Sequence, residues 1–356
     1  MRSSSQDSLS PSSRCVLPES TSLCSLPELS AFYDSVMFQL SNIVMRGHSR
    51  PRLDQVTLTI FSGRTAVVGY SGAGKTSLLN LLMGFEHPDS GSIRHESAPE
   101  SAAGSADRGS DLRLPLFWVP QSGGLWPHLT VDQHLTCLGT PESSDKLLRG
   151  LDLEHRRTAL PAELSLGERS RLALARALVA NAEVLVLDEP LSHVDPVRKP
   201  AYWSLVREIL QEDNVSMVFT SHDPEIVLRH SDRVICLDEG RVVFAGTTST
   251  LYESPPTRET GEFLGPLNWF APEETSLFLS GRTTPVGSLA IRPEHLILRA
   301  DEASPVELIS TPFQSGYAES LVKHVASGRT RTVLHQVPND APRSGQRVRL
   351  TAGETR

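Results

Sequence analysis

The stretch TAVVGYSGAGKTSLLNLL, residues 65–82, restricts the possible folds more than any other part of this sequence. Its first residues form a short continuous apolar run, which is typical of a strand buried on both faces of a sheet. The segment after the glycines predicts a helix. A buried strand, a glycine-rich loop and a helix in this order predict an α/β domain with a ligand-binding loop.

Several other segments predict strands and helices of the same α/β domain. The runs LPLFWVPQ, EVLVLDEP and VSMVFTSH have the texture of buried strands, and the segment 196–212 predicts a helix between the last two. VMFQLSNIV and DQVTLTIFSGR predict two early strands, and RVICLDEGRVVFAG predicts a hairpin that turns at residues 238–240. We therefore expect a mostly parallel sheet.

Length and composition suggest how the rest of the chain is organised. A chain of 356 residues is long enough for about two domains. We expect a disordered Ser/Pro-rich tail over 1–33, an α/β domain over 34–247 and linker helices over 248–285. The α/β domain would contain a low-complexity loop at 95–113 and a helical subdomain at about 122–180. The short strand-like runs of 286–356 predict a small all-β, OB-like domain.

Charge, hydropathy and cysteine use exclude several protein classes. The net charge of −8 argues against a general nucleic-acid binder, and the last segment has few aromatic residues for stacking on bases. No run is apolar enough to predict a spanning helix, and the first residues lack the apolar core of a signal peptide. The four cysteines are scattered and predict neither a zinc site nor a disulfide framework. We expect a cytoplasmic protein.

The motif GYSGAGKT fits the phosphate-binding pattern G-x-x-x-x-G-K-[ST]. Its glycines let the backbone N–H groups face a phosphate chain, and the helix that follows adds its dipole. Lys75 would reach the terminal phosphates, and the hydroxyl of Thr76 would bind Mg²⁺. The predicted nucleotide-binding residues are Gly69, Tyr70, Ser71, Gly72, Ala73, Gly74, Lys75, Thr76 and Ser77.

Polar residues at the ends of the later strands are candidates for catalysis. Asp188 follows the buried run VLVL, at the strand end where α/β sheets bind ligands, and its carboxylate could hold Mg²⁺. Glu189 could accept a proton from an attacking water. His222, at the end of the next strand, is expected to contact the γ-phosphate of the nucleotide. Gln121 could reach the metal or the water, although a plain surface glutamine would have the same spacing.

The segment ELSLGERSRLALARALV predicts a helix that begins with a capping box. Ser165 and Glu168 have the S-x-x-E spacing, in which each side chain satisfies a backbone N–H at the helix start. Arg169, Arg171 and Arg176 are interpreted as part of a solvated face of this helix.

Taken together and in this order, the motifs of residues 35–246 resemble the ATP-binding cassette (ABC) family. They are GYSGAGKT, Gln121, the signature LSLGE, the strand VLVLDEP, the D-loop LSHVD and His222. The resemblance implies ATP and Mg²⁺ as ligands and a head-to-tail dimer. In that dimer the signature residues Ser165, Leu166, Gly167 and Glu168 would face the ATP of the partner, with Ser192 and Asp195 beside the interface. It also implies an adenine-stacking aromatic residue at about 45–48, where this sequence has none.

The segment LAIRPEHL near the C-terminus resembles the small β-barrel domain called TOBE, which follows the cassette in many importer ATPases. The resemblance implies an ATPase that drives solute import on the cytoplasmic face of the cell membrane. Its partners would be a second ATPase subunit, most simply an identical chain, membrane permease subunits and, indirectly, a solute-binding protein. The unusual signature, in particular its Glu168, and the missing aromatic residue leave open an ATP sensor with slow or no turnover.

Overall fold

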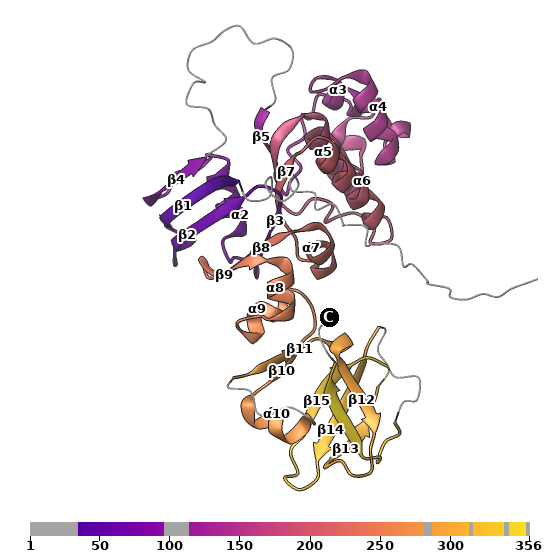
Figure 1. The fold of residues 1–356 in the computed structure, drawn as a ribbon. Coiled ribbons are helices and arrows are strands. Elements are labelled where there is room, and N and C mark those ends of the chain that lie inside the picture. The colour runs from indigo at the N-terminus through magenta and orange to yellow at the C-terminus, as the bar shows by residue number, and fades with distance from the viewer. Residues whose placement is uncertain (1–34, 96–113, 281–286, 313–315, 338–341, 354–356) are drawn as a thin grey trace, which may run out of the picture.

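The computed structural model describes residues 35–95, 114–280, 287–312, 316–337 and 342–353 of the chain. It contains two units, joined by the short helices α8 (Thr248–Glu253) and α9 (Arg258–Glu262) (Figure 1). The predicted N-terminal tail and nearly all of the low-complexity loop at 95–113 lie outside the described residues. Among the described residues, none of the helices combines the length and the apolar character needed to cross a membrane.

The first unit is built on a six-stranded sheet with the order β5-β6-β7-β3-β8-β9. The neighbouring pairs from β5 to β8 are parallel, and β9 joins β8 as an antiparallel edge strand. The strands are β3 (Arg64–Val68), β5 (Leu114–Val119), β6 (Ala182–Leu187), β7 (Ser216–Thr220), β8 (Arg233–Asp238) and β9 (Arg241–Thr247). The predicted parallel α/β sheet and the hairpin at 238–240 are therefore confirmed.

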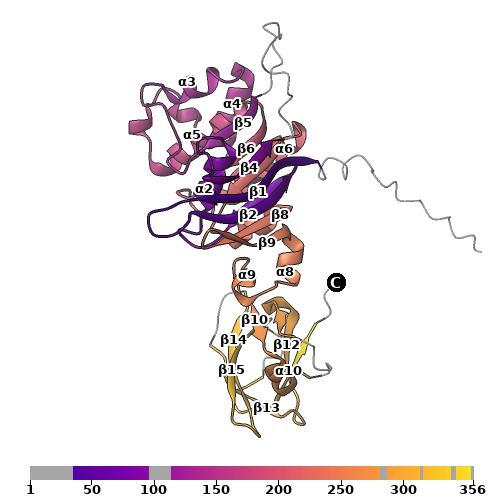
Figure 2. The same ribbon diagram turned by 90° about the vertical axis from the view of Figure 1, so that its left-hand side faces the viewer.

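A second, antiparallel sheet lies beside the first and encloses the helix after the glycine-rich loop. Its order is β2-β1-β4, from the strands β1 (Val36–Met45), β2 (Leu53–Phe61) and β4 (Ser90–His95). The helix α2 (Lys75–Leu82) packs its leucines into one core with side chains of both sheets, including Phe38, Ile60 and Val186. Figure 1 shows the antiparallel sheet to the left of the parallel one, and in Figure 2 it faces the viewer.

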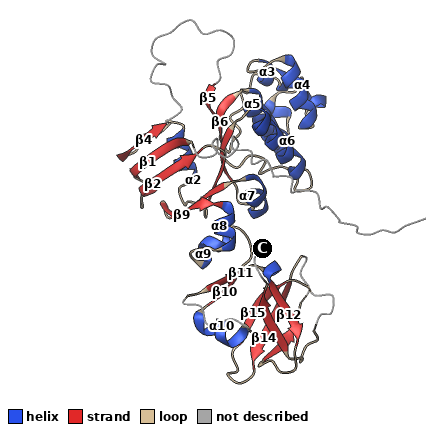
Figure 3. Ribbon diagram, viewed as in Figure 1, coloured by secondary structure: helices blue, strands red, loops and turns tan. Residues whose placement is uncertain are grey.

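Short helices cover the other side of the parallel sheet, as the colouring in Figure 3 shows. The part between β5 and β6 contains α3 (Val131–Thr136), α4 (Pro141–Gly150), η1 (Glu154–Arg156), η2 (Pro161–Glu163) and α5 (Leu166–Val179). Together with α6 (Lys199–Glu212) and α7 (Pro224–His230), these elements bury a second large core against the sheet. The long helix α5 thus lies between the sheet and the smaller helices.

The C-terminal unit has its own apolar core. Its elements are β10 (Asn268–Phe270), α10 (Pro272–Phe278), β11 (Leu289–Ile291), η3 (Pro293–His295), β12 (Leu296–Ala300), β13 (Val306–Ser310), β14 (Ala318–His324), β15 (Thr330–His335) and β16 (Val348–Ala352). They form sheets of the order β10-β11, β12-β16 and β13-β14-β15. The prediction of linker helices up to residue 285 is corrected here, because β10 pairs with β11 and both Phe270 and Phe278 belong to this core.

A buried arginine of the C-terminal unit holds the segment that connects the two units. Arg292, in the LAIRPEHL segment, is only 2% exposed and donates hydrogen bonds to the carbonyl oxygens of Tyr252, Gly261, Gly265 and Pro266. In the connecting segment, directly after α9, the ring of Phe263 lies 5.0 Å from the ring of Tyr70 in the glycine-rich loop. The connection between the units therefore contacts the predicted phosphate site directly.

Candidate nucleotide-binding site

The glycine-rich loop joins β3 to α2 and has a backbone that requires glycine. Gly72 has φ +77° and Gly74 has φ +104°, in the left-handed region that side chains other than glycine rarely adopt. A Cβ atom on Gly74 would also lie 2.4 Å from the carbonyl oxygen of Arg52. No side chain caps the start of α2, so its first N–H groups can receive an anion.

The side chain of Lys75 lies folded over this loop. Its Nζ donates hydrogen bonds to the carbonyl oxygens of Gly69 at 2.8 Å and of Tyr70 at 3.1 Å. Burial lowers the pKa of Lys75, and the nearby carboxylates of Glu189 and Asp188 partly oppose this shift. The loop therefore holds a cation at the position where terminal phosphates would bind.

Thr76 and Asp188 form an oxygen-rich cluster below the loop. The Oγ1 of Thr76 donates to Asp188 Oδ2 at 2.9 Å, and Thr220 donates to Asp188 Oδ1 at 2.7 Å. The hydroxyl of Thr220 also accepts a hydrogen bond from the backbone N–H of Glu189 at 2.7 Å. Hydroxyl and carboxylate oxygens are the ligands that Mg²⁺ takes, so the residues present fit this ion. Thr220 was not among the residues predicted from the sequence.

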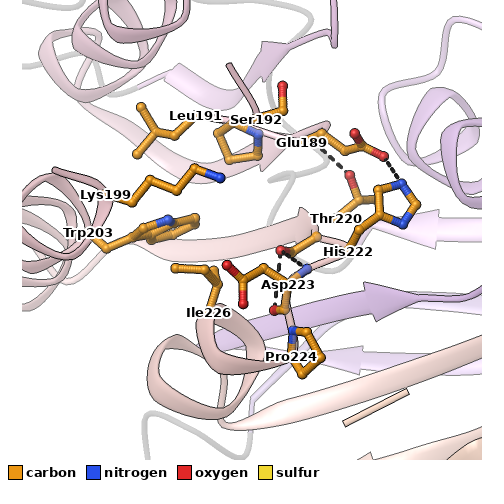
Figure 4. A pocket seen from close by; sticks show the side chains of 12 residues that line it. Glu189, Leu191, Ser192, Lys199, Trp203, Thr220, His222, Asp223, Pro224 and Ile226 are labelled. Atoms are coloured by element: carbon orange, nitrogen blue, oxygen red, sulfur yellow. Dashed lines mark hydrogen bonds and ion pairs between the residues drawn. The ribbon is translucent and has the colours of Figure 1, made fainter. Parts of the chain in front are cut away.

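Glu189 is held by two of the other predicted residues. Its carboxylate forms an ion pair with His222 Nε2 (Figure 4). It also accepts a hydrogen bond from Gln121 Nε2 at 3.3 Å. The backbone of Glu189 has φ +50°, a conformation that is costly for a residue other than glycine and that is concentrated at functional sites. His222 and Gln121 thus contact Glu189, whereas the sequence had suggested the phosphate for His222 and the metal or the attacking water for Gln121.

These residues surround one cavity of about 350 Å³. It is lined by Arg52, Ser71, Gly72, Gly74, Lys75, Thr76, Ser77, Gln121, Glu189 and His222. Of the other predicted phosphate-loop residues, Gly69 and Ala73 are buried behind the loop, and Tyr70 points away toward Phe263. Arg52 was not predicted, because it reaches the cavity from the loop between β1 and β2.

A second cavity, of about 480 Å³, lies on the far side of the Glu189–His222 pair and is drawn in Figure 4. Leu191, Trp203 and Ile226 give it apolar walls, and Ser192 also lines it. The two cavities share Glu189 and His222. The ion pair therefore stands between them.

The signature residues are not part of the phosphate cavity. Ser165 begins α5 with a complete capping box: its side chain accepts from the N–H of Glu168, and the Glu168 carboxylate accepts from the N–H of Ser165 at 2.8 Å. Arg156 donates to the other oxygen of Glu168 at 2.9 Å. Burial alone would raise the pKa of Glu168, but the hydrogen bonds from Arg156 and Ser165 outweigh it and hold the pKa at about 2.

The expectation of a solvated arginine face on α5 is wrong. Arg176 is 6% exposed, donates to the carbonyl oxygen of Gly124 and lies 4.6 Å over the ring of Trp126. Arg171 donates to the carbonyl oxygens of Leu151 and Asp152. The reason is that loops and short helices cover α5, so its long cationic side chains satisfy backbone carbonyls there.

The predicted D-loop lies against the start of α5. A Cβ atom on Gly167 would lie 3.1 Å from the carbonyl oxygen of His193, so the two segments approach closely because residue 167 has no side chain. Ser192 is hydrogen-bonded to the ring of His193 at 3.0 Å, and the carboxylate of Asp195 accepts from the N–H of Val197 at 2.8 Å. The signature and D-loop segments therefore form one continuous part of the surface.

Comparison with known proteins agrees with this geometry. A family profile described as ABC transporter matches residues 53–192. An Fe(3+) ions import ATP-binding protein of Pectobacterium atrosepticum is 34% identical over 64% of this chain and 68% of its own length. A sulfate/thiosulfate import ATP-binding protein of Chromobacterium violaceum is 31% identical over 82% of this chain and 81% of its own length.

Solved structures show the same fold. The ATP-binding subunit of an ABC transporter superposes with a TM-score of 0.52 at 22% identity and covers 60% of this chain and 91% of its own. A dimeric ATP-binding cassette in a post-hydrolysis state, bound to ADP and phosphate, superposes with a TM-score of 0.50 at 23% identity, over 59% of this chain and 98% of its own. The chain therefore belongs to the ABC transporter family and is one of its ATP-binding, ATP-hydrolysing subunits.

Proposed function

We propose that this chain is the ATPase subunit of an importer and that it couples ATP binding and hydrolysis to solute uptake through separate membrane proteins. The names of its relatives, which are ATP-binding proteins of iron and sulfate import, support this proposal. The observation that carries it is the pairing of Glu189 with His222 and Gln121 at the cavity that also contains Lys75. This arrangement brings a base and a phosphate-binding cation to one site.

Each residue of the cavity has a distinct role in this proposal. The amides of residues 69–77 and the ammonium of Lys75 would bind the phosphates and stabilise the charge of the transferring group. Thr76 and Asp188, with Gln121 beside them, would hold Mg²⁺, which neutralises phosphate charge when it is bound. Glu189 would accept the proton of the attacking water. His222 and Gln121 would keep the Glu189 carboxylate directed at that water.

A dimer of two such chains would complete each site. Ser165 and Gly167 would present a hydroxyl, a backbone N–H and a helix start to the γ-phosphate held by the partner. Ser192 and Asp195 would lie at the same interface, which agrees with the close contact between Gly167 and His193. The simplest partner is a second copy of this chain.

Membrane permease subunits would be the further partners, with a solute-binding protein acting through them. The segment Gly124–Val131 is the proposed contact with a permease, and its Trp126 is partly exposed while it packs on Arg176. The chain would then be located on the cytoplasmic face of the cell membrane. No nucleic acid is expected as a partner.

The structure weakens one argument for the alternative function, an ATP sensor with slow or no turnover. The sequence had raised it partly because Glu168 would bring a carboxylate toward the phosphate of the partner. The carboxylate instead turns back to the N–H of Ser165 and to Arg156 of its own chain. The departure at Glu168 therefore gives no reason to expect slow turnover.

The test is size-exclusion chromatography with light scattering of the Glu189→Gln protein, with and without ATP and Mg²⁺. Loss of the base should trap the closed state, so ATP should shift the protein from monomer to dimer. The shift should disappear on adding Ser165→Arg and should persist with Ser276→Arg, a matched exposed serine on α10. A persistent monomer that still binds ATP would overturn the homodimeric motor and favour a sensor or a different cassette partner.

A further inference from the structure

Thr220 is a completely buried polar residue at the end of β7. This strand lies between β6 and β3 in the parallel sheet, and Thr220 is 0% exposed. Side chains alternate along a strand, so Thr220 faces the same side as Val218, which packs in the core around α2. The hydroxyl of Thr220 therefore lies at the edge of the sheet where Asp188 follows β6 and the phosphate loop follows β3.

The hydroxyl of Thr220 makes two short hydrogen bonds, one as a donor and one as an acceptor. It donates to Asp188 Oδ1 at 2.7 Å. It accepts from the backbone N–H of Glu189, also at 2.7 Å (Figure 4). An ionised carboxylate can only accept and an N–H can only donate, so the direction of both hydrogen bonds is fixed. A hydroxyl supplies the donor and the acceptor that this position needs, whereas a valine of the same shape has neither.

Asp188 and Glu189 are neighbours in the chain but contribute to different parts of the site. The other oxygen of Asp188 accepts from Thr76, so this carboxylate belongs to the group of oxygens that fits Mg²⁺. The carboxylate of Glu189 instead pairs with His222 at the phosphate cavity. The hydroxyl of Thr220 contacts both acidic residues where they join.

The end of β7 holds Glu189 at two points. Thr220 holds its backbone N–H, and His222, two residues further along the chain, holds its carboxylate. The backbone of Glu189 has φ +50°, and such a conformation persists only where the surrounding structure maintains it. Because the same hydroxyl also holds Asp188, a displacement of either acidic residue affects the other.

We propose that Thr220 is a positioning residue of the ATPase reaction, which fixes the metal-binding carboxylate of Asp188 relative to the base Glu189. Removal of a partner that orients a metal ligand typically lowers metal affinity or activity by a factor of about 10–100. The inference rests on the roles proposed above for Asp188 and Glu189. It adds a physical link between them, because the same hydroxyl sets the place of the metal ligand and of the base.

The first test compares steady-state ATP hydrolysis by the native protein and by three variants at position 220. Thr220→Val keeps the shape of the side chain and removes both hydrogen bonds, so kcat should fall at least about tenfold. The KM for ATP should stay within about twofold, because Thr220 is not among the residues that line the phosphate cavity. Thr220→Ser keeps the hydroxyl and should retain at least about a third of the native kcat.

The third variant, Thr220→Ala, keeps the test decisive if Thr220→Val does not fold. Serine and alanine differ only in the hydroxyl, so kcat should be at least about tenfold higher in Thr220→Ser than in Thr220→Ala. Equal values of kcat in these two variants would mean that the hydroxyl has no role in the reaction.

The second test needs no hydrolysis and measures how strongly Mg²⁺ tightens the binding of ADP. Titration calorimetry of the full chain with ADP is carried out in Mg²⁺ and in EDTA. Thr220→Val should leave the affinity in EDTA within about twofold and should reduce the tightening by Mg²⁺ about tenfold, because Asp188 has lost its donor. The same reduction should occur in the Glu189→Gln background, since the side chain of Glu189 takes no part in the hydrogen bond between Thr220 and Asp188.

The control is Thr65→Val on the neighbouring strand β3. Thr65 is also buried, at 1% exposure, and no group among the described residues hydrogen-bonds to its hydroxyl. This variant should leave kcat, KM and the effect of Mg²⁺ unchanged. A kcat of Thr220→Val within about threefold of the native value, an equal loss in Thr220→Ser, or a loss confined to KM would each overturn the inference.

Asp188→Asn separates failure of this inference from failure of the proposed metal site. If Asp188→Asn removes the tightening by Mg²⁺ and Thr220→Val does not reduce it, the metal site stands and the role of Thr220 is wrong. If neither variant changes the tightening, the proposed metal site is wrong as well.

Discussion

The two helices that carry the family motifs, α2 and α5, begin in opposite ways. At the start of α2 stands Gly74, in a left-handed conformation and without any side-chain cap, so the first N–H groups remain open. At the start of α5, Ser165 and Glu168 satisfy each other's N–H groups in a complete capping box. Within one chain, α2 is thus prepared to bind an anion, whereas α5 already has its hydrogen bonds satisfied.

This difference indicates an order of events in the proposed dimer. A phosphate can bind at α2 without breaking a protein hydrogen bond there, so nucleotide binding needs only one chain. A phosphate that approaches α5 has to compete with the cap, which contributes about 1 kcal/mol. Charge-assisted hydrogen bonds to phosphate are stronger than neutral ones. We therefore expect the start of α5 to contact a phosphate only when ATP is already bound by the partner.

Removing the ammonium group of Lys75, at the uncapped start of α2, should have the largest effect, and this effect is on the rate of ATP hydrolysis. We expect Lys75→Ala to lower the rate of ATP hydrolysis by a factor on the order of 10²–10³, as for the loss of one preorganised charge-stabilising group. Steady-state phosphate release measures the rate, and circular dichroism controls for folding. A variant that keeps more than a tenth of the native rate would contradict the role of Lys75.

Replacing Ser165 by another residue that can cap α5 should have an intermediate effect, and this effect is on ATP-dependent dimer formation. Aspartate is as good an N-cap as serine, so Ser165→Asp should keep the urea stability within about 0.5 kcal/mol. Its carboxylate should nevertheless repel the phosphate of the partner and weaken ATP-dependent dimer formation in the Glu189→Gln protein at least about tenfold. Ser165→Ala should instead lower the stability by about 1 kcal/mol. Normal dimer formation by Ser165→Asp would show that the start of α5 does not meet a phosphate.

The smallest effect concerns the acid that supports the cap. The pKa of Glu168 is held at about 2, below its ordinary 4.5, so its contribution to stability is fully present above pH 4.5 and is lost as the pH falls toward 2. Glu168→Gln keeps the capping hydrogen bond but loses the ion pair with Arg156, and should cost about 1–2 kcal/mol at pH 7. Urea unfolding at pH 7, 4 and 3 should show the difference shrinking; a constant difference would mean that Glu168 is not charged in the folded protein.

The features that the sequence predicted well are local ones. The buried run before Gly69, the glycines of the phosphate loop and the spacing of Ser165 and Glu168 each depend on neighbouring residues, and each has the predicted structure. The strand-end position of Asp188, Glu189 and His222 was also sufficient to bring these side chains to one edge of the sheet. The partners of Glu189 were less clear, because hydrogen-bond geometry is not encoded in spacing.

The missed features depend on contacts that are distant in sequence. Arg52 enters the cavity because the β1–β2 hairpin folds over the phosphate loop, and Arg176 is buried because residues 124–126 cover α5. Strand β10 is only three residues long, and it joins the C-terminal unit through pairing with β11. The omission of Thr220 had a visible signal, since Thr220 is the last residue of the buried strand β7 and lies just before His222.

The buried guanidinium of Arg292 also makes the C-terminal unit mechanically continuous with the nucleotide site. One side chain holds four carbonyl oxygens on both sides of Phe263, and Phe263 lies on the ring of Tyr70. These hydrogen bonds fix the conformation of the segment that connects the two units. A rotation of the C-terminal unit has either to break this set of hydrogen bonds at once or to carry Phe263, and with it the wall of the phosphate loop, along with it.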